Sequence, residues 1–166
     1  MGVDEDDFFQ AISCFKGASN RLEKLYSTYN SFIFKDFAHS PSKVKATVNA
    51  IKDQFDEYKI IACFELHTFS SLNSDFINEY KDTLSNADIA IVYFSKKTLQ
   101  SKKMNNIEFS DIVKAFNNND LIVFDDSLKF KDYLNSMDFD NSVLLMMSSG
   151  NFGNIDYDDL QKLLLN

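Results

Sequence analysis

Five short apolar runs, separated by segments with helical periodicity, set the strongest limit on what this chain can fold into. Each run has the length of a buried β-strand, and together they lie at residues 31–37, 59–66, 88–94, 121–124 and 142–147. Strands that are apolar along their whole length and alternate with helices are typical of a mostly parallel sheet covered on both faces. We therefore predict an α/β fold, a Rossmann-like three-layer sandwich.

Apolar stripes with helical spacing lie between and after these runs. The clearest is formed by Val44, Val48, Ile51 and Phe55, and the others lie at residues 76–84, 109–116, 130–137 and 160–164. Before the first run, residues 4–15 predict an amphipathic helix. Residues 21–26 are expected to pair with residues 32–37 as an antiparallel hairpin, and residues 125–127 to cap a helix. With 166 residues the chain has the length of a single domain, residues 1–166.

Charge and composition exclude several classes of partner. The chain has 25 acidic and 17 basic residues, a net charge of −8, which argues against binding to nucleic acid or to an anionic membrane. No apolar run approaches the roughly 20 residues that span a bilayer, and the N-terminus is acidic, unlike a signal peptide. We therefore expect a cytoplasmic protein. Cys14 and Cys63 lie among apolar residues without metal-binding spacing, so we expect buried free thiols and no metal site.

Polar side chains follow the first apolar run. In such folds ligands bind beyond the carboxyl ends of the parallel strands. Asp36 and His39 form an ionisable pair there, next to an expected helix start. Ser40 and Pro41 suit that start, because a serine oxygen accepts from free amides and proline tolerates the first turn. A plain helix cap therefore competes with ligand binding at Ser40.

A histidine and three hydroxyl groups follow the second run. His67 and Thr68 come directly after it, and Ser70 and Ser71 are close behind. A substrate loop and a solvated turn with a serine cap account for them equally well. Glu65 lies inside the apolar run, where an unpaired carboxylate would be costly, so it must face the rim or have a partner.

Two glycines follow the last run, within Ser148-Ser149-Gly150-Asn151-Phe152-Gly153. Glycine permits a positive φ and a close backbone approach to a ligand. The segment lacks the spacing of a phosphate-binding P-loop and of a G-x-S-x-G nucleophile elbow. A turn followed by a helix cap is the alternative to a ligand-binding loop.

Arg21 is the only arginine in the chain. Its planar fork of donors suits a phosphate or a carboxylate in a way that lysine does not reproduce. A structural ion pair with Glu23 or Asp36 is the alternative, although exposed ion pairs add little stability.

Taken in order, these segments resemble the C-terminal domain of the Mur ligases, ATP-dependent enzymes that build the peptidoglycan precursor of the cell wall. The similarity covers nearly the whole chain, including the helix at residues 43–54. Its motifs are Phe15-Lys16-Gly17, Arg21-Leu22-Glu23, Asp36-Phe37-Ala38-His39-Ser40-Pro41, Phe64-Glu65-Leu66-His67 and Ser148-Ser149-Gly150-Asn151-Phe152-Gly153. Mur ligases have three domains. The resemblance implies that the N-terminal UDP-binding domain and the central ATPase domain lie outside this chain, which we expect to be cut at a domain boundary just before Val3.

The resemblance also implies roles for individual residues. Arg21 would reach the γ-phosphate of ATP, and Asp36 would hold the nucleotide ribose. The missing domains would supply the catalytic residues and bind most of the ATP and Mg²⁺. The substrate-binding residues would be His39, Ser40, His67, Thr68, Ser71, Ser148, Gly150, Asn151 and Gly153.

Three departures from the family pattern bear on the substrate. Thr68 and Ser71 stand where alanine-adding members have arginines that grip the amino-acid carboxylate, and Ser40 replaces a frequent histidine. We therefore expect a peptide, rather than free L-alanine, to be joined to UDP-N-acetylmuramate, as in murein recycling. The alternatives are an alanine-adding ligase, a stand-alone Rossmann-like binding module and, more distantly, a small hydrolase using Ser148 or Ser149. We expect the isolated chain to be inactive and to need no obligate protein partner.

Overall fold

The computed structural model describes residues 21–104 and 106–165, so the helix expected at residues 4–15 and Cys14 lie outside the described residues. In chain order the elements are β1 (Glu23–Ser27), β2 (Ser31–Asp36), α2 (Pro41–Gln54), β3 (Lys59–Leu66), the 3₁₀ helix η1 (Ile77–Tyr80), β4 (Ile89–Phe94), α3 (Lys96–Ser101), α4 (Phe109–Phe116), β5 (Ile122–Phe124), α5 (Ser127–Asn135), β6 (Ser142–Met147) and the 3₁₀ helix η2 (Tyr157–Leu164).

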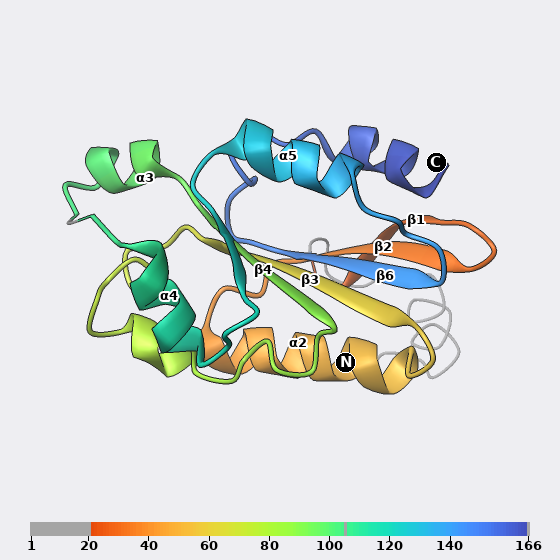
Figure 1. Ribbon diagram of the computed structural model, residues 1–166, viewed down its shortest axis with the longest axis horizontal. Helices are drawn as coiled ribbons and strands as arrows, with labels where there is room; N and C mark the ends of the chain where they lie inside the picture. The colour runs from red at the N-terminus through yellow and green to blue at the C-terminus, as the bar shows by residue number, and fades with distance from the viewer. Residues whose placement is uncertain (1–20, 105, 166) are drawn as a thin grey trace, which may run out of the picture.

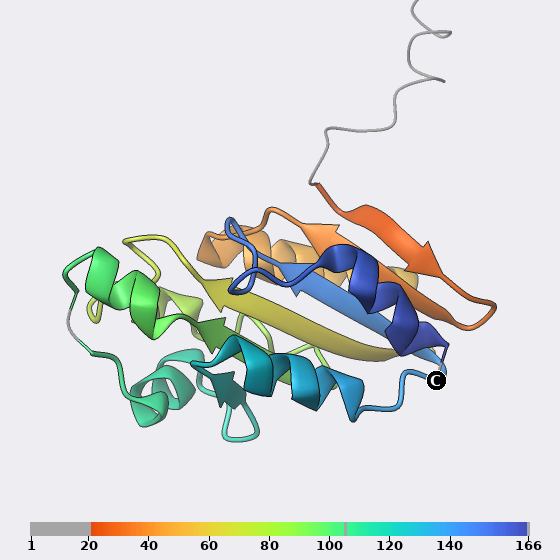
Figure 2. The same ribbon diagram turned by 90° about the horizontal axis from the view of Figure 1, so that it is seen from above.

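Six strands form one sheet in the order β1-β2-β6-β3-β4-β5. β1 runs antiparallel to β2, and all other neighbouring strands are parallel. In Figure 1, α2 and α4 lie below the sheet, and α5 and η2 lie above it. Figure 2 shows this upper layer from above, with α5 and η2 lying over the strands. The predicted three-layer α/β sandwich with an antiparallel hairpin is confirmed.

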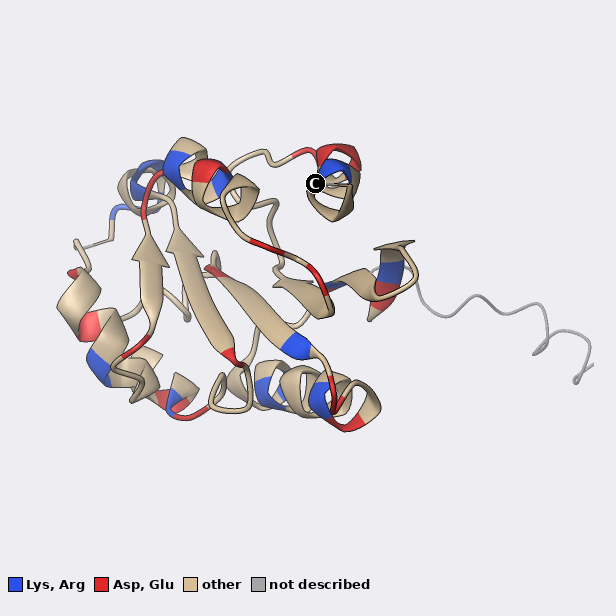
Figure 3. Cartoon of the chain, turned by 45° about the vertical axis from the view of Figure 1, so that its right-hand side comes forward, with Lys and Arg blue, Asp and Glu red and all other residues tan. Residues whose placement is uncertain are grey.

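All five apolar runs are strands, and each observed end lies within one residue of the predicted one. Every residue of β6 is buried, as expected for a strand covered on both faces. In Figure 3 the charged residues lie mainly on helices, in loops and at strand ends.

Side chains of each strand alternate between two cores. On β3, Ile60, Ala62 and Phe64 pack in the core on the α2 side, whereas Ile61 and Cys63 pack in the core on the α5 side. Cys63 is a buried free thiol, as predicted. The same alternation directs Glu65 to the α5 side, at the carboxyl end of the strand.

The prediction of a helix at residues 76–84 is wrong. Only the 3₁₀ turn η1 forms, followed by turns in which Asp82 adopts a left-handed φ of 59°. The Asp82 amide donates to the carbonyl of Phe116 at 3.2 Å, so a tertiary contact takes the backbone out of a helical path. Tyr80 and Leu84 are nevertheless buried, as the apolar stripe predicts.

Helix ends agree with the sequence in most cases. Ser40 is the N-cap residue of α2 and Pro41 occupies its first position, as predicted, but the Ser40 side chain makes no capping hydrogen bond. Asp126 caps α5 by accepting from two backbone amides, as predicted. The segment after β6 ends in a 3₁₀ helix rather than an α-helix, with Leu160 and Leu163 buried. Within the described ranges, no helix is both long and apolar enough to cross a membrane.

Candidate functional site

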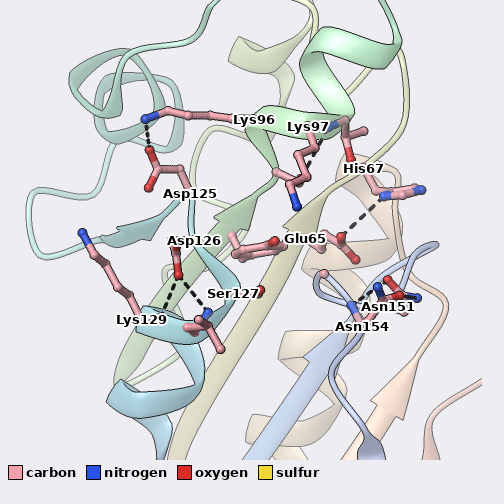
Figure 4. Close-up of a pocket in the computed structure, with 15 residues that line it drawn as sticks. Glu65, His67, Lys96, Lys97, Asp125, Asp126, Ser127, Lys129, Asn151 and Asn154 are labelled. Carbon is pink, nitrogen blue, oxygen red and sulfur yellow. Dashed lines mark hydrogen bonds and ion pairs between the residues drawn. The ribbon is translucent and has the colours of Figure 1, made fainter.

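A crevice of about 720 Å³ opens beyond the carboxyl ends of β3, β4, β5 and β6 (Figure 4). It lies at the edge of the sheet where ligands bind in open α/β folds. Its β3–β6 wall is formed by Glu65, His67, Asn151, Gly153 and Asn154. Its β4–β5 wall is formed by Tyr93, Ser95, Lys96, Lys97, Thr98, Asp125, Asp126, Ser127, Leu128 and Lys129.

Glu65 organises the β3–β6 wall. Its side chain is 2% exposed, and its Oε2 accepts hydrogen bonds from the Ser148 hydroxyl and, at 2.9 Å, from the Phe152 amide. The other oxygen, Oε1, lies 3.4 Å from Nδ1 of His67. The carboxylate therefore has partners, as its burial requires, and ties the loop after β6 to the end of β3.

Gly150 and Gly153 let this loop pack against both walls. A Cβ atom on Gly150 would lie 2.6 Å from Nδ1 of His67 and 2.8 Å from Oε2 of Glu65. Gly153 has a φ of +70°, and a Cβ atom there would lie 2.4 Å from the Tyr93 hydroxyl. The glycines thus serve close packing of the loop, and the backbone of Gly153 lines the crevice.

Ser148 and Tyr93 carry hydroxyl groups in the region of the crevice, and only Tyr93 lines it. Ser148 is 4% exposed, and its oxygen accepts from the Gly150 amide at 2.6 Å while its hydrogen goes to Glu65. Ser148 is therefore committed to the loop. Burial raises the pKa of the Tyr93 hydroxyl, and the nearby charge of Glu65 raises it further.

Opposite charges on the β4–β5 wall are largely matched. Lys96 forms an ion pair with Asp125, and the hydrogen bond to Asp125 raises the pKa of Lys96. Asp126 accepts from the amides of Leu128 and Lys129 at 2.9 and 3.0 Å, and these bonds hold its pKa below the usual range. This is the arrangement expected of an aspartate at a helix N-terminus.

Arg21 and Asp36 line a second hollow of about 480 Å³, together with Phe37, Lys43 and Thr47. Asp36 is 8% exposed and accepts from the Leu22 amide at 3.2 Å and from the Thr47 hydroxyl. Within residues 21–104, no ion pair joins Arg21 to Glu23 or to Asp36, so the structural pairs weighed for Arg21 do not form.

Several other predicted site residues, including His39, Thr68 and Ser71, do not line the crevice. His39 turns its Nδ1 to the Phe37 carbonyl at 2.9 Å, and the His39 carbonyl accepts from Tyr80. Thr68 and Ser71 bond to each other in a turn, in which the Thr68 hydroxyl accepts from the Ser71 amide at 3.1 Å.

Asn151 lines the crevice, and its amide group donates to the Asn154 side chain at 2.8 Å. The structure thus brings His67, Asn151 and Gly153 together at one crevice and Arg21 with Asp36 at another hollow.

Sequence reasoning missed the contribution of the β4 end to the crevice. Ser95, Lys96 and Lys97 follow an apolar run in the same way as the segments that were singled out. The sequence pattern at Asp125 and Asp126 indicates only a helix cap. Applying the rule of strand carboxyl ends to the third and fourth runs would have found both sets.

Comparisons with known proteins give both sequence relatives and structural neighbours, although no protein-family model matches the chain. The UDP-N-acetylmuramate–L-alanine ligase of Caldicellulosiruptor bescii is 40% identical over 92 residues, which cover 55% of this chain and 20% of that protein. The same enzyme of Agathobacter rectalis is 25% identical over 166 residues, 98% of this chain and 35% of that protein. At most, the chain spans about a third of the length of the curated relatives it matches.

Solved structures share the fold over most of the chain. A murein peptide ligase from Psychrobacter arcticus matches with a TM-score of 0.70 and 20% identity, over 95% of this chain and 32% of that one. A domain assigned to a UDP-N-acetylmuramate:L-alanyl-γ-D-glutamyl-meso-diaminopimelate ligase of Haemophilus ducreyi matches with a TM-score of 0.60 and 25% identity, over 87% of this chain and 98% of that one. The UDP-N-acetylmuramate–alanine ligase of Thermotoga maritima matches with a TM-score of 0.67 and 16% identity, over 90% of this chain and 31% of that one.

The fold and the crevice together define a Rossmann-like α/β domain whose polar groups gather at the carboxyl ends of its parallel strands. The chain is similar in sequence to Mur ligases. Its fold is that of the C-terminal domain of Mur ligases, as the resemblance predicted.

Proposed function

We propose that this chain is the substrate-presenting domain of an ATP-dependent amide ligase that joins a peptide to UDP-N-acetylmuramate in peptidoglycan recycling. The observation that carries the proposal is the polar crevice at the strand carboxyl ends, in a fold shared with a murein peptide ligase over 95% of the chain. Its volume of about 720 Å³ lies within the range of small-molecule sites.

The β3–β6 wall suits the amine of the incoming peptide. Because Nδ1 of His67 faces Glu65, the other ring nitrogen is the one available to a ligand, and the ring is 36% exposed. A histidine held in this way can orient an amine and take up its proton as it attacks an acyl phosphate. The loop around Gly150, which packs closely against His67 and Glu65, would exclude water from one side of the amine.

The second hollow suits part of the nucleotide. When bound, ATP supplies the phosphoryl group that activates the muramoyl carboxylate. The Arg21 guanidinium offers a fork of donors for phosphate oxygens. Asp36 accepts two internal hydrogen bonds, and a carboxylate has about four acceptor positions, so it retains capacity for a ribose hydroxyl.

The Mg²⁺ ion is proposed to be held elsewhere. Among the described residues no group of three or more His, Cys, Asp or Glu side chains is placed to hold a metal ion. In this proposal the present domain positions substrate and nucleotide, and the domains that carry the metal ligands and the UDP-sugar site lie outside this chain.

An alanine-adding ligase is the second candidate. It is favoured by the 40% identity to the UDP-N-acetylmuramate–L-alanine ligase of Caldicellulosiruptor bescii over 92 residues. Against it stand Thr68 and Ser71, which are bonded to each other and offer no positive charge to an amino-acid carboxylate.

Amide formation by the product of the complete reading frame tests the proposal. The protein is incubated with ATP, Mg²⁺ and UDP-N-acetylmuramate, and with either L-alanyl-γ-D-glutamyl-meso-diaminopimelate or L-alanine, and products are measured by mass spectrometry. We expect the tripeptide to be used and Arg21→Ala to lower kcat/KM by at least about 10²-fold. Lys24→Ala is the control, since this exposed lysine lies on β1 near Arg21.

Two results would contradict the proposal. Efficient use of L-alanine alone would show that the peptide specificity is wrong. No amide product with either substrate would show that the ligase function is wrong. The chain of 166 residues by itself is expected to show no ATP turnover, and turnover that Arg21→Ala abolishes would contradict that expectation.

A further inference from the structure

A third hollow, separate from the two sites described above, is lined mainly by exposed side chains. It is a groove of about 530 Å³ between the segment that follows β3 and the turn that follows α3, and both lie at the left of Figure 1. Phe69, Phe76 and Met104 form its apolar surface, and Asp75 and Glu79 are its charged lining residues. It shares no lining residue with the crevice or with the hollow proposed for the nucleotide, so neither of their roles explains it.

Ordered backbone holds the two phenylalanines in exposed positions. Phe69 is 60% exposed, in a turn where the Leu72 amide donates to the Thr68 carbonyl at 3.2 Å. Phe76 is 36% exposed, and its ring meets the Tyr80 ring edge-on, with the centroids 6.2 Å apart. Leu72 and Tyr80 are buried in the core on the α2 side and anchor the segment there. The two rings are therefore presented on a fixed support, as aromatic side chains are at sites where proteins bind one another.

The charges of the groove favour a cationic partner. Asp75 and Glu79 form no ion pair with a lysine, arginine or histidine of residues 21–104 or 106–165. The Phe69 ring also attracts cations, because the Lys102 ammonium lies over it, 4.1 Å from its centroid. Lys102 does not itself line the groove. Two carboxylates beside apolar rings therefore complement a side chain that joins a positive charge to an apolar stem.

The exposure of the groove favours a protein segment over a small molecule. Small-molecule sites enclose most of the ligand, whereas every lining residue of this groove except Met104 is exposed. We propose that the groove is a docking site for a basic, apolar segment of a partner protein, in which lysine or arginine alternates with leucine or phenylalanine. Its apolar side chains would pack on Phe69 and Phe76, and its cations would pair with Asp75 and Glu79. This role does not depend on the proposed ligase function.

Titration of the isotope-labelled chain with short peptides, followed by two-dimensional amide NMR, tests the assignment. The basic probe is acetyl-Leu-Lys-Phe-Lys-Leu-amide, and the acidic probe is acetyl-Leu-Glu-Phe-Glu-Leu-amide, which has the same apolar side chains and the opposite charge. Phenethylammonium serves as a small organic cation. We expect the basic peptide to shift the amides of residues 69–79 and of Met104, and the acidic peptide to leave them unchanged.

Two pairs of variants separate the groove from the rest of the surface. Glu79→Gln should weaken the Kd of the basic peptide about 3-fold, whereas Glu57→Gln, at an exposed glutamate outside the groove, should change it less than about 1.5-fold. This control is needed because the net charge of −8 attracts any basic peptide. Phe69→Ala should weaken the Kd about 5-fold or more, and Tyr29→Ala, at a 99% exposed aromatic residue outside the groove, less than about 1.5-fold. All four side chains are exposed, so the variants are expected to fold.

Each alternative outcome overturns a defined part of the proposal. Equal binding of the acidic peptide in the groove would overturn the cationic character of the partner. No shift at residues 69–79, or an equal loss of affinity in Glu79→Gln and Glu57→Gln, would overturn the docking site. Phenethylammonium that binds the groove as tightly as the basic peptide would show that the occupant is a small organic cation and not a protein segment. An unchanged amide spectrum of each free variant confirms that it is folded.

Discussion

Replacing Glu65 by alanine is expected to loosen the loop after β6 from the rest of the sheet. The carboxylate is 2% exposed and accepts from the Ser148 hydroxyl and from the Phe152 amide at 2.9 Å. Both donors are buried, and a buried donor without a partner costs about 1–3 kcal/mol. Glu65→Ala leaves two of them, so we expect the free energy of unfolding to fall by about 2–6 kcal/mol. That is a large part of the 5–15 kcal/mol that holds a typical domain together.

Urea unfolding followed by circular dichroism measures this change. Glu65→Gln keeps an oxygen that, in the position of Oε2, can accept from both donors. Only the extra strength of hydrogen bonds to a charged group is lost, so the decrease should be smaller, about 1–2 kcal/mol. Glu57→Ala removes an exposed glutamate and should change the free energy of unfolding by less than about 0.5 kcal/mol. If Glu65→Ala is as stable as Glu57→Ala, Glu65 does not hold the loop, and the reasoning about the β3–β6 wall is wrong.

Three further predictions concern local features. Gly153→Ala forces a side chain into a φ of +70° and 2.4 Å from the Tyr93 hydroxyl, so thermal unfolding should show a loss of about 1–3 kcal/mol; an unchanged Tm would refute the packing argument. Hydrogen bonds from Lys162 and Lys131 lower the pKa of Asp159 to about 2. The ionised Asp159 therefore stabilises the folded chain fully above its ordinary pKa of about 3.9, and this stabilisation is lost as the pH falls through 2. In Lys162→Ala the pKa of Asp159 should be higher, as measured by carbon-detected NMR titration, and an unchanged pKa would contradict the assignment. Burial raises the pKa of the Cys63 thiol, so peptide mapping should find it unmodified by a thiol reagent at pH 8 unless denaturant is added; rapid labelling of the folded chain would show that it is accessible.

The sheet could be predicted because burial on both faces leaves its strands apolar along their whole length. The two 3₁₀ helices could not be told from α-helices, since apolar residues spaced three and four apart fit either form. The helical path ends after η1 because the Asp82 amide donates to the Phe116 carbonyl. A local sequence pattern does not predict a hydrogen bond between residues so far apart in the chain.

The sequence predicts only part of the site, because the rest depends on contacts between distant segments. The segments after β3 and β6 contain histidine and glycine, which are rare in this chain and therefore indicate candidate site residues. Lys96 and Lys97 follow β4 and have the composition of an ordinary solvated helix start. Only the strand order, which brings the ends of β4 and β5 next to those of β3 and β6, makes them part of one crevice.

The crevice and the hollow lined by Arg21 and Asp36 are joined by one hydrogen-bond network. The Ser148 amide donates to the Asp36 carbonyl at 3.0 Å, and the Ser148 hydroxyl donates to Glu65, so β2, β6 and β3 are joined at their carboxyl ends. Asp36 also holds the Leu22 amide, which fixes the backbone next to Arg21. A movement of the whole domain would therefore carry both sites together and leave their separation unchanged. Since a misplacement of about 1 Å can cost 10²-fold in rate, fixing that separation in the sheet rather than in a mobile loop would favour the proposed ligase reaction.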